Sequence, residues 1–170
     1  SLTMIQTDYD LVVIGGGLVG ASLACALDGL GLRIGLVEAA PLTVSAHPGY
    51  DDRTLALAQG TRRIFQTLGL WEALAATAAP IQRIHISERG SPGFAHLNAR
   101  EEGVEALGYV VEARQVGAAL LTKLPNLRGV ELLCPARLET VAIEPEAVRV
   151  ALRCGDNRTV QLHSRLLVAA

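Results

Sequence analysis

The sequence lacks the features that mark several functional classes. Its 15 Lys and Arg residues are balanced by 17 Asp and Glu, for a formal net charge of −2, and no basic run is present. This balance argues against a nucleic-acid-binding protein. No apolar stretch approaches the roughly 20 residues of a membrane-spanning helix, and no signal peptide is recognisable. These exclusions leave the class of globular proteins. The 170 residues of the chain suffice for one domain with a buried core.

Residues that would suggest metal binding or nucleophilic catalysis are also scarce. The odd number of cysteines and their wide spacing predict reduced thiols in a cytoplasmic protein. The histidines show neither pairing nor ligand spacing, so they are interpreted as structural or solvent-exposed. These residues are Cys25, Cys134, Cys154, His47, His85, His96 and His163. We therefore predict no metal site and no catalytic side chain, and if the protein is an enzyme, a cofactor must carry the chemistry.

The most informative stretch lies near the N-terminus. An apolar run at residues 9–14 predicts a strand, and a helical pattern follows over residues 18–27. Between them stand Gly15, Gly17 and Gly20, spaced as in the glycine motif of dinucleotide-binding units. The sequence therefore predicts a strand–turn–helix that binds a dinucleotide. A glycine-rich turn that only packs a helix against a strand is the alternative.

Each glycine of this turn has a separate physical role. Gly15 permits the tight turn, Gly17 lets a diphosphate approach the backbone, and Gly20 allows close contact between helix and strand. The backbone amides of Leu18 and Val19 open the helix, whose N-terminal end attracts an anion. These five residues are the predicted diphosphate site.

Two charged residues extend this site. Glu38 ends the second predicted strand, at residues 33–37, where its carboxylate can accept the ribose hydroxyls of an adenosine. Its charge would repel a 2′-phosphate, which favours FAD or NAD over NADP; an exposed acid at a strand end is the alternative. The loop over residues 39–52 exceeds the usual 2–6 residues. Arg53 directly after it could reach a diphosphate or flavin, or could be a surface arginine.

The remaining pattern predicts an α/β fold with a parallel sheet, a β-meander and an added small β segment. Helices are expected at residues 59–68, 71–78 and 115–124. Strands are expected at residues 84–87, 94–98, 109–111, 130–134 and 166–169, with a meander formed by 138–143, 148–152 and 159–162.

The two ends of the sequence lead to two separate expectations. Residues 1–3, ahead of Met4, are interpreted as an expression-vector remnant. Residues 165–170 predict a buried strand with no polar tail, which is unusual for the end of a natural domain. We therefore expect the chain to be a truncated fragment.

Longer stretches resemble a known family. AHPGYDDRTLALAQGT at residues 46–61 is the most specific, and it is accompanied by VVIGGGLVGASLA, RIHISERGSPGF and ALGYVVEARQVGAALL. Together they resemble the flavin-dependent aromatic hydroxylases of ubiquinone biosynthesis, whose fold is similar to that of p-hydroxybenzoate hydroxylase. The resemblance runs over nearly the whole chain.

The resemblance implies a Rossmann-like FAD-binding domain. Residues 1–170 would be its N-terminal portion, and residues from about 81 to 112 would begin the sheet of a substrate domain. The three glycines would hold the FAD diphosphate, Glu38 the adenosine ribose, and Arg53 the cofactor near its diphosphate or flavin. Many relatives carry an Arg or Gln that touches the flavin at the position of Ala113, and Arg114 is the candidate substitute.

The implied activity is hydroxylation of a prenylated methoxyphenol. NAD(P)H would reduce FAD, and O2 would give a flavin hydroperoxide that hydroxylates the ring. A lipophilic phenol substrate implies peripheral contact with the inner face of the membrane, and other ubiquinone-pathway enzymes are the expected partners. Because the family's second FAD segment follows the position of Ala170, this fragment is expected to be inactive and to bind FAD weakly or not at all.

Two other functions stay open at this stage. Another FAD oxidoreductase, such as an amine oxidase or a geranylgeranyl reductase, would share the N-terminal glycine motif. A non-catalytic NAD-binding module would share it too, but that module would show NAD affinity in the isolated chain.

Overall fold

The protein divides into two compact units. The computed structural model describes residues 7–90 and 92–170, so the predicted remnant at residues 1–3 lies outside the described residues. One unit comprises the described residues up to Asp51 together with Gly117–Ala170, and the other comprises Asp52–Val116. We call them the glycine-turn unit and the inserted unit.

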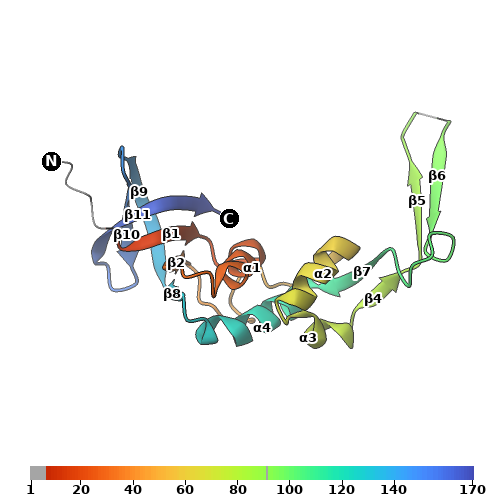
Figure 1. Ribbon diagram of the computed structural model, residues 1–170, viewed down its shortest axis with the longest axis horizontal. Helices are drawn as coiled ribbons and strands as arrows, with labels where there is room; N and C mark the ends of the chain where they lie inside the picture. Colours follow the sequence, from red (N-terminus) through yellow and green to blue (C-terminus); the bar gives the residue numbers. More distant parts are fainter. Residues whose placement is uncertain (1–6, 91) are drawn as a thin grey trace. The chain divides into compact units, whose positions relative to one another are not determined.

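The glycine-turn unit is built on a six-stranded sheet (Figure 1). Its order is β8-β2-β1-β11-β10-β9. The strands β8, β2, β1 and β11 run parallel, and β9 and β10 extend the sheet antiparallel. The bounds are β1 Tyr9–Ile14, β2 Ile34–Val37, β8 Val130–Leu133, β9 Ala136–Ile143, β10 Val148–Cys154 and β11 Thr159–Ala169. The predicted α/β fold with a parallel sheet and a meander is confirmed.

Strand β11 joins the meander to the parallel sheet. Two separate strands were expected, at residues 159–162 and 166–169, but one continuous strand covers both. Its first half pairs antiparallel with β10, and its second half pairs parallel with β1. The polar residues between the halves suggested a break. Ser164, however, is fully buried, and its hydroxyl donates a 2.7 Å hydrogen bond to the carbonyl of Leu166, so the strand continues.

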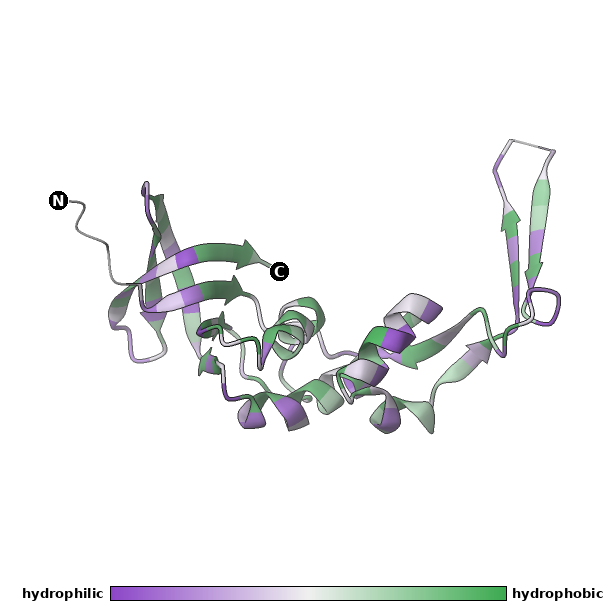
Figure 2. Cartoon of the chain, viewed as in Figure 1, coloured by the Kyte–Doolittle hydropathy of each residue, from purple (hydrophilic) through white to green (hydrophobic). Residues whose placement is uncertain are grey.

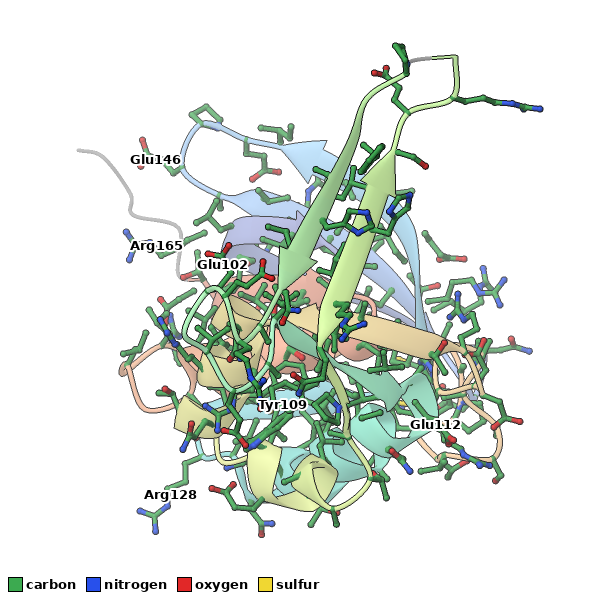
Figure 3. All side chains as sticks on the ribbon, turned by 90° about the vertical axis from the view of Figure 1, so that its right-hand side faces the viewer. Glu102, Tyr109, Glu112, Arg128, Glu146 and Arg165 are labelled. Carbon is green, nitrogen blue, oxygen red and sulfur yellow. The ribbon has the colours of Figure 1, made fainter. Side chains whose placement is uncertain are left out.

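The core of this unit lies on the central strands. Val12 and Val13 of β1 are fully buried, as are Ala21 and Ala24 of helix α1 (Leu18–Leu27), whose small side chains let the helix approach the sheet. Figure 2 shows the ends of β1 and β11 as largely apolar. The charged side chains of Arg128, Glu146 and Arg165, by contrast, are exposed and project outward (Figure 3).

The inserted unit contains two small antiparallel sheets. One has the order β3-β7-β4, with bounds Thr54–Ala58, Gly108–Glu112 and Ala79–Ile81, and β5 (Arg83–Ser87) pairs with β6 (Phe94–Asn98) in a hairpin (Figure 1). Its helices are α2 (Gln59–Thr67) and α3 (Trp71–Ala75). The rings of Trp71 and Tyr109 meet edge to face, with centroids 4.9 Å apart.

Several elements differ from the sequence prediction. Strands β3 and β4 were not expected. Pro80 lies in β4, shortly after the helix expected at residues 71–78, and β4 tolerates a proline because it is at the edge of its sheet. Helix α4 (Ala113–Lys123) begins two residues earlier than predicted and is followed by the short helix η1 (Leu124–Asn126).

Candidate cofactor site

The glycine turn connects the end of β1 to the start of α1. Gly15 has φ +111°, a conformation that side chains disfavour, and Gly17 is the N-cap residue of the helix. No side chain caps this helix end, so its first backbone amides, including those of Leu18 and Val19, lack a capping acceptor within the described residues. An anion at this position would find ready hydrogen-bond donors.

Close contacts of Gly15 and Gly20 with backbone atoms fix the shape of this turn. A Cβ atom on Gly20 would lie 1.8 Å from the carbonyl oxygen of Gly15, and a Cβ on Gly15 would lie 2.3 Å from that of Ala170. At Gly17 the situation is the opposite, because a Cβ there would have Cε1 of His47, at 3.8 Å, as its nearest neighbour. Gly15 and Gly20 are therefore required by packing, whereas a methyl group at Gly17 would make only an ordinary van der Waals contact with the protein.

Glu38 is held against this turn. Its Oε2 accepts a 2.6 Å hydrogen bond from the amide of Gly16, and its Oε1 accepts one of 2.7 Å from the amide of Ala40. His47 Nε2 lies 3.1 Å from Oε2. Burial alone would raise the pKa of this carboxyl, but the contacts with Ala40, His47 and Gly16 outweigh it and hold the pKa below its ordinary value. Glu38 is therefore an ionised, fixed carboxylate at the end of β2.

His47 and Tyr50 belong to this site, although the sequence did not identify them. The His47 side chain is 5% exposed and its ring stacks on that of Tyr50, with centroids 4.3 Å apart. The Tyr50 hydroxyl donates a 2.7 Å hydrogen bond to the carbonyl of Gly16, and burial, with Glu38 nearby, raises its pKa to about 12. Gly117 accommodates the Tyr50 ring, since a Cβ there would lie 2.4 Å from it. The long loop after β2 thus folds back onto the glycine turn.

A cavity of about 270 Å³ opens beside Glu38. Ala39 and Pro135 line it, with residues of the turn between β10 and β11 on another side. The amide of Ala136, also in its lining, donates a 2.8 Å hydrogen bond to the carbonyl of Glu38, so the cavity adjoins the end of β2. A larger apolar cavity of about 430 Å³ shares Pro135 and Ala136 with it.

The predicted arginines lie in the inserted unit. Arg53 is exposed, and its carbonyl accepts a 2.8 Å hydrogen bond from the amide of Ala113. Arg114 binds Oε2 of Glu112 at 2.8 Å and Oδ1 of Asp52 at 3.1 Å, and the Glu112 hydrogen bond chiefly raises its pKa. Arg114 is thus engaged by two carboxylates of its own unit, and contact of Arg53 with a cofactor stays a prediction.

The histidines and cysteines form no evident metal centre. His85 and His96 are exposed cross-strand neighbours with ring nitrogens 3.3 Å apart, and His47 is buried beside Glu38. The three cysteines are free, and burial raises the pKa of Cys25 and Cys134. Over residues 7–90 and 92–170, no group of three His, Cys, Asp or Glu side chains could hold a metal ion. In the same described residues, no helix has the length and apolarity to cross a membrane.

Comparison with known proteins identifies the class of this site. The model of the FAD-binding domain family matches residues 8–170, so the chain belongs to this family and its cofactor is FAD. The FAD-binding domain that the family resemblance implied is therefore confirmed. The resemblance of the sequence to the flavin-dependent aromatic hydroxylases of ubiquinone biosynthesis is confirmed as well, because the curated relatives that it matches are named ubiquinone hydroxylases.

The chain is similar to two named ubiquinone hydroxylases. Ubiquinone hydroxylase UbiL of Rhodospirillum rubrum is 37% identical over 161 residues, covering 95% of this chain and 36% of the relative. Ubiquinone hydroxylase UbiM of Neisseria meningitidis is 31% identical, covering 95% of the chain and 35% of the relative. The chain thus spans about a third of the length of these curated relatives.

Solved structures agree on the fold. The crystal structure of p-nitrophenol 4-monooxygenase PnpA from Pseudomonas putida superposes with a TM-score of 0.76 at 18% identity, covering 98% of this chain and 41% of that one. The monooxygenase PieE, solved in complex with FAD and substrate, superposes with a TM-score of 0.74 at 18% identity, covering 95% and 30%. Because each of these structures is only 18% identical to this chain, the similarity shows a shared fold alone.

Proposed function

We propose that the intact protein, meaning this chain with any further sequence it has in the cell, is a flavin monooxygenase of ubiquinone biosynthesis. It hydroxylates a prenylated methoxyphenol, and this chain supplies part of its FAD site. The observation that carries the proposal is the ionised carboxylate of Glu38 fixed beside an uncapped helix N-terminus. The names of the ubiquinone hydroxylases UbiL and UbiM support the substrate class.

In this proposal the glycine turn holds the FAD diphosphate. The residues are Gly15, Gly17, Leu18, Val19 and Gly20. The absence of a side chain at Gly17 and the uncapped amides fit a diphosphate. Glu38 accepts the adenosine ribose hydroxyls, and the cavity lined by Ala39 and Pro135 takes the adenine. Arg53 completes the site near the diphosphate or flavin.

FAD, once reduced by NAD(P)H, activates O2 for transfer of one oxygen atom to the phenol ring. The chain's own residues bind and orient the cofactor, and we assign none of them a catalytic role. Residues from about 81 to 112 begin the substrate-domain sheet. Their hairpin exposes Ile86 and Leu97 on the same face, and these apolar side chains suit a lipophilic phenol. The enzyme would then be cytoplasmic and in peripheral contact with the membrane that holds its substrate, alongside other enzymes of the pathway.

The test is to purify the intact protein and examine its flavin and its reactions. We expect bound FAD, NAD(P)H oxidation stimulated by a prenylated phenol, and a product that carries one atom from ¹⁸O2. NAD binding without FAD would indicate a non-catalytic module instead. Bound FAD with oxidation of amines, or reduction of a prenyl chain, would indicate a different flavoprotein with the same N-terminal unit.

A further inference from the structure

His47 contacts several parts of the candidate site at once. Its Nδ1 accepts a 3.0 Å hydrogen bond from the amide of Gly49, and its Nε2 lies 3.1 Å from Oε2 of Glu38. The ring stacks on Tyr50, which in turn is bonded to Gly16. One imidazole thus joins the loop after β2 to both the carboxylate and the glycine turn.

The contact with Gly49 determines where the His47 proton lies. Since Nδ1 accepts a hydrogen bond, the neutral imidazole carries its proton on Nε2. This N–H faces the Glu38 carboxylate. It meets Oε2 obliquely rather than along a well-directed hydrogen bond, and Nε2 is otherwise enclosed by protein. The interaction is therefore chiefly electrostatic, and it ties the orientation of the carboxylate to the imidazole.

The contacts of Glu38 leave room for a ligand on one oxygen. A carboxylate has about four acceptor positions. The amide of Gly16 and the imidazole of His47 lie at Oε2, and the amide of Ala40 takes one position of Oε1. A further position of Oε1 stays available for a hydroxyl donor. Two of the three groups that fix the Glu38 carboxylate are backbone amides. His47 is therefore the side chain whose substitution can alter the orientation of this carboxylate.

We propose that His47 is a positioning residue of the FAD site, one that acts through Glu38 and does not itself touch the cofactor. The inference rests on the proposed FAD-binding function and adds a residue to it. Holding the carboxylate in its binding orientation before FAD arrives reduces the entropy lost on binding. Loss of His47 should therefore weaken the binding of the adenosine part of FAD and leave the binding of its flavin part unchanged.

The experiment is a double-mutant cycle on the intact protein, with FAD and FMN as ligands. FMN lacks the adenosine that Glu38 would bind. We expect His47→Ala to raise the Kd for FAD by about tenfold, the effect of losing an electrostatic contact that orients a charged group. We expect the same change to raise the Kd for FMN by less than about twofold. In a Glu38→Gln background, His47→Ala should add less than about twofold. His47→Gln, which retains an N–H donor, should lie closer to wild type.

His163→Gln is the matched control. His163 makes its hydrogen bonds with Asp8 through its backbone, so this change should leave both Kd values unchanged. Circular dichroism and thermal melting check that each variant is folded. If H47A does not fold, His47→Asn takes its place in the cycle, because its shorter side chain does not reach Glu38.

Each contrary result has a distinct meaning. Additive effects of the His47 and Glu38 changes would overturn the proposed coupling. Equal weakening of FAD and FMN would show that His47 only maintains the fold. A wild-type intact protein that binds no FAD would contradict the proposed function itself, and not only the role of His47.

Discussion

The hydroxyl of Tyr50 donates a 2.7 Å hydrogen bond to the carbonyl of Gly16, which lies 34 positions earlier in the sequence. The Tyr50 residue is 2% exposed, and its ring is stacked on His47. This contact fastens the long loop after β2 to the glycine turn. The turn is therefore held by tertiary contacts as well as by its own glycines.

Tyr50→Phe should destabilise the protein by about 1–2 kcal/mol, because it leaves the carbonyl of Gly16 without this buried donor. The weakened turn should also bind FAD less tightly. Chemical denaturation and FAD titration of the intact protein measure the two effects. Tyr109→Phe is the control, since phenylalanine keeps the packing of the Tyr109 ring on Trp71. Equal stability of Tyr50→Phe and wild type would contradict the role of this hydrogen bond.

Two helical glycines should respond oppositely to alanine. Gly117→Ala places a Cβ 2.4 Å from the Tyr50 ring and should cost about 1–3 kcal/mol through overpacking. Gly60→Ala, in α2, meets nothing within 4 Å and should stabilise the protein by about 0.5–1 kcal/mol, the difference in helix propensity. Urea denaturation of both variants tests this, and the same sign for both changes would refute the packing of Tyr50 against α4.

The stability contributed by Glu38 should depend on pH. Its pKa in the folded protein is lowered from the ordinary value of 4.5, so its contribution is fully present above that value and is lost as pH falls through the lowered pKa. Glu38→Gln should flatten this part of the stability profile at acidic pH and should weaken FAD binding at neutral pH. Denaturation midpoints between pH 3 and 7, roughly the window of carboxyl titration, provide the measurement. If the stability of the variant fell with decreasing pH as steeply as that of wild type, another carboxyl would be responsible for the pH dependence.

Local sequence patterns predicted the first elements of the glycine-turn unit well. The strand before Gly15, the helix after Gly17 and the second strand ending in Glu38 are each encoded by short-range periodicity, and all lie where the sequence placed them. Strand β3 was missed because its five residues obtain their order from pairing with β7, about 50 positions away in the sequence. Strand β4, which contains Pro80, was missed because its place at the sheet edge depends on pairing with the same strand β7.

His47 and Tyr50 could not be assigned from spacing. Their contacts with Glu38 and Gly16 are tertiary, and a histidine and a tyrosine in a long loop have no periodic signature. The available signal was the length of the loop itself, together with Gly117 in the middle of a helix. A glycine there, unfavourable for helix formation, indicates that a bulky group packs against that position.

FAD binding by the Gly17→Ala variant of the intact protein tests the central claim, that the diphosphate occupies the space at the glycine turn. A Cβ on Gly17 would have Cε1 of His47, at 3.8 Å, as its nearest protein atom, so the variant should match wild type in stability within about 0.5 kcal/mol. It should nevertheless bind FAD at least about tenfold more weakly, because the methyl group would fill the space that the diphosphate needs. A stable Gly17→Ala variant with wild-type FAD affinity would contradict the account.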